Sequence, residues 1–296
     1  MPRTFRSGFI SIVGRPNVGK STLLNHLVGE KLAGVSRKPQ TTRHVIRGIV
    51  SRPEGQAVFL DTPGFHEPHD RLGDWMMGEI GKALEGSDLI YWVVFPEPPD
   101  TLDQELAGKF QKGAIPLFLL INQVDRVVKP KRPPLLEAWR KLHPFREVLS
   151  ISAVHGENLS VLVEKTFQAL PENPAYFDDG ILTDQNERTI VGEIIREKVF
   201  RFTGEEVPYS SAVEIEEFKE KSAGLVVIKA AVVVEKDSQK VILIGKGGAK
   251  IKQIGQAARL EIERFLGKKV FLELWVKTLK NWKKDPEALK RLGYGG

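Results

Sequence analysis

The sequence contains no cysteine among its 296 residues. This absence excludes disulfide bonds, thiolate nucleophiles and metal sites with sulfur ligands. Long apolar runs are absent as well. LIYWVVF and IPLFLLI are strand-length and far shorter than the roughly 18 residues of a membrane-spanning helix. The N-terminus has no signal-peptide architecture, because its short apolar run leads directly into a glycine loop. These features fit a protein of the reducing cytoplasm and leave a peripheral contact with a membrane open.

Positive charge is concentrated at one end of the chain. Residues 240–296 hold 14 Lys and Arg against 5 Asp and Glu, a net charge of +9, whereas the other residues hold 30 against 33, a net charge of −3. Such a distribution is expected where one end of a chain binds a polyanion. A solvated, lysine-rich surface would have the same charge, so charge alone does not decide between the two.

Apolar runs alternate with helical stretches from Phe9 to about Leu170. The expected strands are FISIV, VIRGIVS, QAVFLD, LIYWVVF, IPLFLLI and VLSIS. The expected helices are STLLNHLVG and stretches near residues 75–84, 102–111 and 134–142. Short apolar runs separated by helices predict βαβ units, and therefore an α/β domain with a mostly parallel sheet and helices on both faces.

The order of elements changes after Pro171–Thr183, a stretch rich in Pro, Asp and Gly that we interpret as a linker. A helix (187–202), two strands (SSAVEIEEF and GLVVIKAAVVVE), a glycine loop, a helix (249–266) and a last strand (KVFLELWVK) follow. This pattern predicts a smaller α+β domain. We place the domains at 1–172 and 186–296, with the linker at 173–185.

A phosphate-binding loop follows the first expected strand. GRPNVGKS matches G-x-x-x-x-G-K-[ST] in the strand–loop–helix context that the motif requires. Its glycines let backbone N–H groups point at a β-phosphate, Lys20 supplies positive charge to the β- and γ-phosphates, and the Ser21 hydroxyl binds Mg²⁺. A glycine-rich turn without a ligand is much less probable in this context. The nucleotide contacts expected here are Gly14, Arg15, Pro16, Asn17, Val18, Gly19, Lys20, Ser21 and Thr22.

Two downstream segments supply further expected contacts with the phosphates and the metal. Asp61-Thr62-Pro63-Gly64 follows a strand, so that Asp61 lies at a carboxyl end of the sheet and can hold Mg²⁺ through water, while the Gly64 N–H can sense the γ-phosphate. Between the two motifs lies QTTR, residues 40–43, in which a threonine hydroxyl could complete the Mg²⁺ shell when a triphosphate is bound. Two solvated threonines at a strand edge are the alternative.

Two later loops predict a preference for guanine. Asn122-Gln123-Val124-Asp125 and Ser152-Ala153 each follow an expected strand. The Asp125 carboxylate can accept hydrogen bonds from the N1–H and 2-amino groups of guanine, neither of which adenine has. We expect Asn122 to tie this loop to the phosphate loop and the Ala153 N–H to meet guanine O6.

GRPNVGKS, QTTR, DTPG, N-x-V-D and ISA occur in an order that resembles the translation-factor-related GTPases. VILIGKGGAKIKQIGQAAR resembles a type II KH domain, and the combination resembles the Era family of bacterial ribosome-assembly GTPases. This resemblance favours Thr42 over Thr41 as the Mg²⁺ ligand. It also implies cytoplasmic maturation of the small ribosomal subunit by binding to the 3′ end of its RNA, with some peripheral membrane association. We further expect a monomer.

The motifs depart from the pattern of related GTPases at two positions. Gln123 stands where N-K-x-D has lysine, which predicts weakened nucleotide affinity with guanine selectivity retained. Phe65 stands where Ras-like switches have a water-orienting glutamine, so we expect slow intrinsic hydrolysis. Asn17 resembles the position that helps to hold a monovalent cation in related GTPases, and we hypothesise K⁺-stimulated hydrolysis; that Asn17 only braces the loop is equally open. The residues expected to act in hydrolysis are Lys20, Thr42, Gly64 and Asn17.

The C-terminal glycine loop is the expected RNA contact. G-x-x-G loops let KH domains approach a nucleic-acid backbone closely, and the helix that follows this one is basic. The expected RNA-binding residues are Gly245, Lys246, Gly247, Gly248, Lys250 and Lys252. Trp275 and Trp282 could stack bases, but burial is the favoured interpretation.

Two functions remain open from the sequence. One is a GTP-hydrolysing switch that releases an RNA-bound assembly. The other is a GTP-gated RNA chaperone with little hydrolysis, which Phe65 and Gln123 favour. A tRNA-modification GTPase is disfavoured by the KH-like domain and by the absence of cysteine. His26, His66, His69 and His143 show no metal-ligand spacing.

Overall fold

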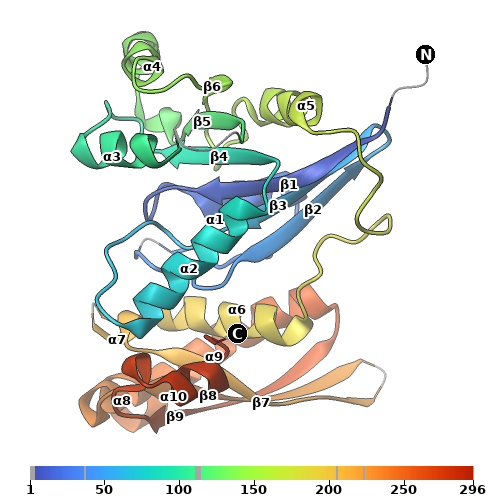
Figure 1. Cartoon of the computed structure of the whole chain (residues 1–296). Helices are drawn as coiled ribbons and strands as arrows, with labels where there is room; N and C mark the ends of the chain where they lie inside the picture. Colours follow the sequence, from blue (N-terminus) through green and yellow to red (C-terminus); the bar gives the residue numbers. More distant parts are fainter. Residues whose placement is uncertain (1–3, 37, 111–114, 205, 223, 296) are drawn as a thin grey trace. The chain divides into compact units, whose positions relative to one another are not determined.

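A computed structural model describes residues 4–36, 38–110, 115–204, 206–222 and 224–295. The chain divides into two compact units, whose elements are labelled in Figure 1. The first consists of the described residues of 1–32, 45–66 and 78–184, and the second of those of 33–44, 67–77 and 185–296. Two short segments from the N-terminal half, 33–44 and 67–77, therefore belong by their contacts to the unit that contains the C-terminal half.

The first unit contains a six-stranded sheet in the order β2-β3-β1-β4-β5-β6. All neighbouring strands pair in parallel except β2, which pairs antiparallel with β3. β3, β4 and β5 are buried along their whole length, as expected for strands covered on both faces. The strands are β1 (Arg6–Val13), β2 (Ile46–Arg52), β3 (Gly55–Asp61), β4 (Leu89–Val94), β5 (Leu117–Ile121) and β6 (Glu147–Ser150).

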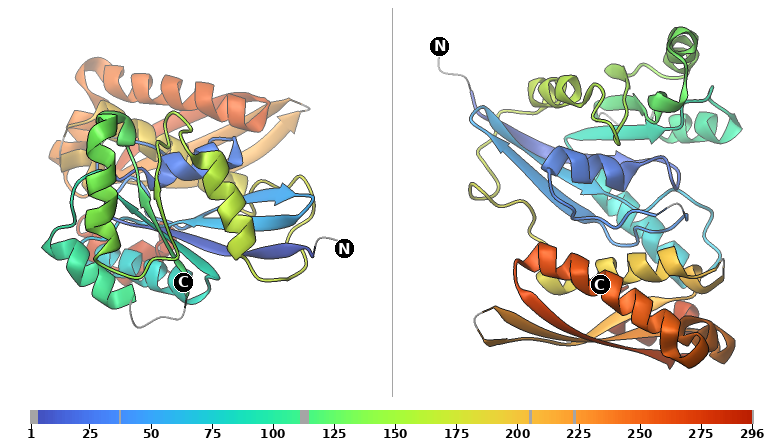
Figure 2. Two further views of the ribbon diagram at one scale, coloured as in Figure 1. Left: turned by 90° about the horizontal axis from the view of Figure 1, so that it is seen from above. Right: turned by 180° about the vertical axis from the view of Figure 1, so that it is seen from behind.

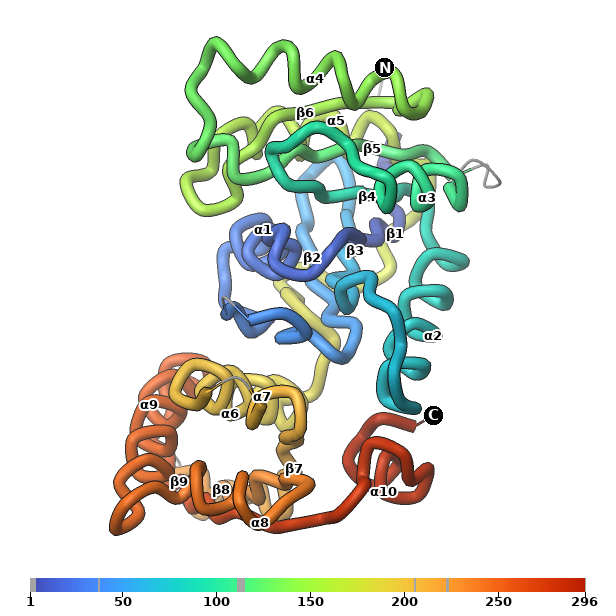
Figure 3. The backbone as a smooth tube through the Cα atoms, turned by 90° about the vertical axis from the view of Figure 1, so that its left-hand side faces the viewer, coloured from blue at the N-terminus to red at the C-terminus, as the bar shows by residue number. Residues whose placement is uncertain are grey.

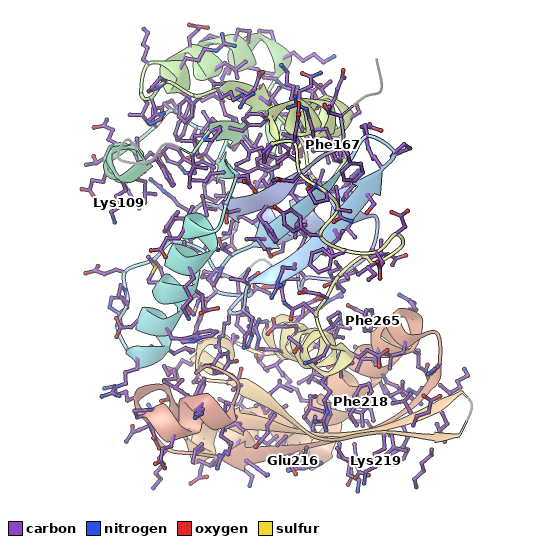
Figure 4. All side chains as sticks on the ribbon, turned by 45° about the vertical axis from the view of Figure 1, so that its right-hand side comes forward. Lys109, Phe167, Glu216, Phe218, Lys219 and Phe265 are labelled. Carbon is purple, nitrogen blue, oxygen red and sulfur yellow. The ribbon has the colours of Figure 1, made fainter. Side chains whose placement is uncertain are left out.

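Helices cover both faces of this sheet, as predicted. The C-terminal half of α2 lies in front of the sheet in Figure 1, and α1 lies in front when the sheet is seen from behind in Figure 2. On α5, Phe167 is buried, while Lys109 of α3 is exposed; both are labelled in Figure 4. The helices are α1 (Lys20–Val28), α2 (Arg71–Glu85), α3 (Thr101–Phe110), α4 (Arg132–Arg140) and α5 (Leu159–Ala169), with 3₁₀ turns η1 (Val124–Arg126) and η2 (Lys129–Lys131).

The stretch interpreted as a linker is held against the first unit over most of its length. Gln56 Oε1 accepts hydrogen bonds from the backbone N–H groups of Tyr176 (2.8 Å) and Phe177 (2.9 Å). The N–H of Ile49 in β2 donates to the carbonyl of Leu182 at 2.8 Å. These bonds satisfy backbone groups along the edge of the sheet, so the stretch is ordered although it forms no helix or strand.

The second unit contains a three-stranded sheet in the order β7-β8-β9, in which β7 pairs antiparallel and β9 parallel with β8. Figure 3 shows α6 and α9 side by side. Phe218 of β7 lies on the helix side of the sheet and Lys219 on the opposite side (Figure 4). The elements are α6 (Glu187–Phe202), α7 (Glu206–Tyr209), β7 (Ala212–Ser222), β8 (Leu225–Val234), α8 (Asp237–Ile244), η3 (Lys246–Gly248), α9 (Ala249–Leu266), β9 (Lys269–Thr278), η4 (Trp282–Lys284) and α10 (Pro286–Arg291).

Four helices of the structure, α5, α7, α8 and α10, are not among those predicted from the sequence. The apolar VILI ahead of the glycine loop forms the last turn of α8, in which Leu243 is buried while Val241 and Ile242 are exposed. The helix expected near 102–111 is α3, which ends at Phe110; position 111 lies outside the described residues.

Candidate nucleotide and RNA sites

The phosphate loop connects β1 to α1 through backbone conformations that favour glycine. Gly14 has φ +149° and Gly19 has φ +98°. A Cβ atom at Gly14 would lie 2.2 Å from the carbonyl oxygen of Val93, and one at Gly19 would lie 2.3 Å from Nδ2 of Asn122. Both glycines are therefore required by close approach as well as by dihedral angle.

Lys20 is the first residue of α1, and its ammonium group is turned back onto the loop. Nζ donates to the carbonyl oxygens of Gly14 (3.1 Å) and Arg15 (3.0 Å). Burial lowers the pKa of Lys20 to about 8, although the charge of Asp61 opposes this shift. The loop thus holds a buried cation close to its own backbone, where a phosphate group would stabilise the charge.

Oxygen ligands suited to Mg²⁺ meet at the carboxyl ends of β1 and β3. Asp61 pairs in register with Ile12, and Ser21 Oγ donates to Asp61 Oδ2 at 2.6 Å. A hydroxyl and a carboxylate are the hard oxygen donors that Mg²⁺ prefers. Thr62 is fixed beside them because its Oγ1 donates to the carbonyl of Ile12 at 2.8 Å.

The end of the DTPG segment lies against the phosphate loop. A Cβ atom at Gly64 would lie 2.7 Å from the backbone nitrogen of Pro16, so only glycine fits there. The N–H of Phe65 donates to the carbonyl of Gly14 at 3.1 Å. The Phe65 ring contacts the Phe110 ring, with 6.4 Å between their centroids. Phe65 therefore braces the loop, and its side chain offers no polar atom to a water molecule.

Asn122 joins the three loops at this edge of the sheet. Its Nδ2 donates to the carbonyl of Val18 at 2.7 Å, and its Oδ1 accepts from the N–H of Ala153 at 2.9 Å. The tie between Asn122 and the phosphate loop is thus present. The Ala153 N–H is already used within the protein, so its contact with guanine O6 remains a prediction.

Asp125 is held ionised next to these loops. Its Oδ1 accepts from Ser152 Oγ at 2.6 Å, and this hydrogen bond lowers the pKa of the Asp125 carboxyl. An ionised carboxylate only accepts hydrogen bonds, which matches the donors on guanine's N1 and 2-amino positions.

Gln123, the departure from N-K-x-D, bonds directly to the phosphate loop. Its backbone has φ +62°, and its Nε2 donates to the carbonyl of Asn17 at 2.9 Å. The amide therefore links the base-recognition loop to the phosphate loop without the positive charge of a lysine.

The guanidinium of Arg15 is directed toward the start of α3. Its Nη1 donates to Asp100 at 2.8 Å, and its Nη2 pairs with Asp100 and with Asp103, the latter at 3.0 Å. This ion pair raises the pKa of Arg15 and lowers that of Asp100. This brace could not be predicted from the sequence, because neither aspartate lies in a nucleotide-binding motif.

Thr42 lies in segment 33–44, which belongs to the second unit. Its side chain is buried, with 8% of the residue exposed. The carbonyl of its neighbour Thr41 is bonded by Arg196 of α6. The assignment of Thr42 as a metal ligand stays a prediction.

The G-x-x-G loop lies between α8 and α9. Gly245, Gly247 and Gly248 have φ +70°, +58° and +77°, and the Gly248 N–H donates to the Gly245 carbonyl at 3.1 Å. Lys246 and Lys252 are exposed and Lys250 is half-buried. Three residues in left-handed or related conformations leave the loop backbone free of side chains, as close approach to a phosphodiester chain requires.

The two tryptophans considered for base stacking differ. Trp282 is fully buried and its Nε1 donates to the carbonyl of Ser210 at 3.1 Å. Trp275 is half-buried, and Lys277 Nζ lies 5.8 Å from its ring centroid. Burial of Trp282 is thus confirmed, and this residue is excluded from base stacking.

Comparison with known proteins identifies a GTPase domain and a KH domain in this chain. Residues 9–123 match the model of a family described as 50S ribosome-binding GTPase, and residues 206–283 match the KH domain family. GTPase Era of Geobacter metallireducens is 50% identical over 98% of this chain and 98% of its own length. GTPase Era of Lactobacillus helveticus is 44% identical over 99% of this chain and 97% of its own. This chain belongs to the Era family of GTPases.

Solved structures of Era share this fold over nearly the whole chain. A crystal structure of Era with MgGDPNP and nucleotides 1506–1542 of 16S ribosomal RNA has a TM-score of 0.95 at 40% identity, covering 99% of this chain and 100% of that one. A variant of Aquifex aeolicus Era bound to GDP and AlF₄⁻ has a TM-score of 0.95 at 39% identity, covering 98% and 100%. The expected fold, a phosphate-loop GTPase domain followed by a type II KH domain, is confirmed.

A membrane-spanning helix and a metal-binding cluster can be looked for in the part of the chain that the structure describes. Within it, no helix combines the length and apolar character needed to cross a bilayer. The same residues contain no group of three or more His, Asp or Glu side chains that could hold a metal ion.

Replacing Gln123 by alanine should weaken nucleotide binding, because the bond between Nε2 and the Asn17 carbonyl is lost. We expect GDP affinity to fall about five- to tenfold, the size of one net hydrogen bond. The preference for GDP over ADP should persist, since Asp125 is unchanged. Titration of both nucleotides into both proteins measures this, and unchanged GDP affinity would show that the Gln123 bond contributes nothing.

The affinity for GDP should fall with rising pH because the pKa of Lys20 is lowered to about 8 in the nucleotide-free protein. Below this pH the ammonium is charged and stabilises the β-phosphate; above it the free protein must first take up a proton. Between pH 7 and 9 we expect affinity to decrease steadily in the wild type. Lys20→Met should bind more weakly at pH 7 and lose this part of the dependence. Parallel curves for both proteins would contradict the assignment.

Proposed function

We propose that this chain is a GTP-hydrolysing switch that binds the 3′ end of 16S ribosomal RNA and assists the assembly of the small ribosomal subunit. The observation that carries the proposal is the presence of both sites in one chain. The first unit contains the phosphate loop and the Asp125 carboxylate held by Ser152, and the second contains the G-x-x-G loop. The relative crystallised with MgGDPNP and nucleotides 1506–1542 of 16S RNA supports the choice of RNA.

The nucleotide-binding roles follow from the contacts described above. The backbone N–H groups of residues 14–19 and Lys20 would bind the phosphates, and Asp125 the guanine. Asn122 and Gln123 hold the loops at fixed separation through Val18 and Asn17. Arg15 would contribute its backbone, since its guanidinium pairs with Asp100 and Asp103. Thr22, Pro16, Thr62, Pro63, Val124 and Ser152 complete the proposed nucleotide site.

Mg²⁺ fits the oxygens of Ser21 and Asp61, which lie within hydrogen-bond distance of each other. We assign the metal to Ser21, Asp61 and Thr42. When bound, it neutralises charge on the β- and γ-phosphates. Lys20 would add a further positive charge, and the Gly64 N–H would contact the γ-phosphate; the close approach of Gly64 to Pro16 of the phosphate loop supports this role.

Hydrolysis must proceed without a glutamine at position 65. Because Phe65 packs against Phe110, water has to be oriented by backbone groups or by a bound partner. We propose that Asn17 helps to hold K⁺, which would supply the charge that an arginine finger supplies elsewhere. The φ of +64° at Asn17 and its bond from Gln123 also fit a residue that only braces the loop.

The RNA site is assigned to the glycine loop (Gly245–Gly248) with Lys246, Lys250 and Lys252. Its basic surroundings would make binding dependent on salt concentration. We further propose domains at 1–172 and 186–296 with a linker at 173–185. Family resemblance alone supports a cytoplasmic monomer with peripheral association with the inner face of the membrane, which mass in solution and flotation with lipid vesicles would check.

A GTP-gated RNA chaperone with little hydrolysis is the second candidate. The contact of Phe65 with Phe110 favours it, because position 65 then offers no polar side chain to activate water. Both candidates bind GTP and RNA, so only turnover in the presence of the RNA distinguishes them.

The deciding experiment measures GTP hydrolysis with and without single-stranded RNA that matches the 3′ end of 16S RNA, in K⁺ and in Na⁺ buffer. We expect RNA to stimulate the rate at least tenfold in K⁺. Gly247→Asp should lose this stimulation, because it adds a negative charge where φ is +58° and space is open. Gly267→Asp is the matched control, since its φ is +64° with open space at the far end of α9, and it should respond like the wild type.

RNA that binds tightly without changing the rate would favour the chaperone. The variant Asn17→Ala tests whether Asn17 helps to hold K⁺ or only braces the loop. If the wild type hydrolyses GTP at the same rate in K⁺ and in Na⁺, and the variant has that same rate, the cation role is excluded.

A further inference from the structure

Helix α6 carries four charged residues, three of them consecutive, that are almost fully buried. Glu193, Arg196, Glu197 and Lys198 expose 6%, 1%, 4% and 3% of their surface. Buried charges cost several kcal/mol each unless they are paired and hydrogen-bonded. Neither the nucleotide motifs nor the glycine loop accounts for this row of charges, and all of its contacts described below lie within the second unit.

Arg196 binds two successive carbonyl groups of segment 33–44. Its Nη2 donates to the carbonyl of Thr41 and its Nη1 to that of Gln40 at 3.4 Å. Glu193 pairs with the same guanidinium, accepting from its Nε at 3.2 Å. The planar fork of arginine allows all these bonds at once.

Thr42 is flanked on its other side by a second buried arginine. Arg43 donates to the carbonyls of Ser211 (2.7 Å) and Pro208 (3.3 Å) and to the hydroxyl of Tyr294 (3.3 Å). Farther along the segment, Lys38 donates to the carbonyl of Phe200 at 2.8 Å. The backbone around Thr42 is therefore held on both sides by groups of the second unit.

The same helix is joined to the helix that follows the glycine loop. Lys198 pairs with Glu261 of α9 and, at 2.8 Å, with Glu197 of α6. Glu197 in turn accepts from the N–H of Val35 at 3.3 Å. A continuous row of charged contacts thus runs from α9 through α6 to segment 33–44.

We infer that Arg196 is a positioning residue for Thr42. The carbonyl of Thr41 and the N–H of Thr42 belong to one planar peptide group, so that fixing the carbonyl fixes the plane from which Thr42 extends. This inference rests on the proposed role of Thr42 as an Mg²⁺ ligand in the triphosphate state. It places one determinant of triphosphate binding on α6, outside the nucleotide motifs.

The test compares affinities for GDP and for a non-hydrolysable GTP analogue, in Mg²⁺ and in EDTA. Arg196→Lys keeps the charge that Glu193 needs but loses the fork. We expect its affinity for the analogue in Mg²⁺ to fall about tenfold, with GDP affinity within twofold of the wild type. The loss should disappear in EDTA. Amide hydrogen exchange at Thr42 should also be faster in the variant.

Two further variants separate this inference from the proposed function. Thr42→Ala should show the same selective loss, and the double variant Thr42→Ala/Arg196→Lys should lose no more than either alone. If Thr42→Ala loses the preference and Arg196→Lys keeps it, the positioning role is wrong while the metal role of Thr42 stands. If Thr42→Ala has no effect, both assignments fail.

Stability is controlled on the same helix. Arg201→Lys changes an exposed arginine of α6 and should match the wild type in every measurement. If the melting temperature of Arg196→Lys falls steeply, the uncharged double variant Glu193→Gln/Arg196→Gln is measured in its place. A stable neutral pair that retains the wild-type preference for the triphosphate would overturn the inference.

Discussion

The hydrogen bonds from Arg196 to the backbone of Gln40 and Thr41 hold segment 33–44, which follows α1, within the second unit. A buried guanidinium needs more acceptors than one carboxylate provides, and Glu193 alone does not satisfy it. The carbonyls of segment 33–44 supply the missing acceptors, so the arginine and the segment stabilise each other. As a result, the threonines between the first two nucleotide motifs pack with α6 in the second unit.

Segment 67–77, which follows the DTPG motif, has the same property for a different reason. Leu72 and Met76 are buried in an apolar cluster with Trp282, Leu289 and Tyr294. Asp70 is paired with Lys283 at 3.3 Å. Segments 33–44 and 67–77 are therefore both held within the second unit, the first by hydrogen bonds to buried charges and the second by apolar burial.

Much of the first site could be predicted from the sequence because short motifs impose it. The spacing of Gly14, Gly19 and Lys20 requires a particular backbone, and Asp61, Asn122 and Ser152 each follow strands whose carboxyl ends meet at one edge. The sequence also identified Gln123 as a departure. It could not predict that its amide would bond to Asn17, since this contact depends on the separation of two loops from different strands.

The contacts missing from the prediction are long-range and carried by residues outside any motif. Arg196 and Glu193 look like ordinary surface charges of a helix, and only the packing of α6 on all sides shows that they are buried. Asp100 and Asp103 are equally ordinary in sequence, yet they fix the orientation of Arg15. Linear spacing predicts groups that act on one ligand; it does not predict which distant backbone a buried charge will bind.

The most direct test of this account is the affinity of the intact chain for RNA matching the 3′ end of 16S RNA, measured with GDP and then with a non-hydrolysable GTP analogue in Mg²⁺. Because α6 contacts both segment 33–44 and α9, we expect the RNA affinity with GDP and the RNA affinity with the analogue to differ by at least about fivefold. Equal affinities would contradict it, since the two sites would then be energetically independent.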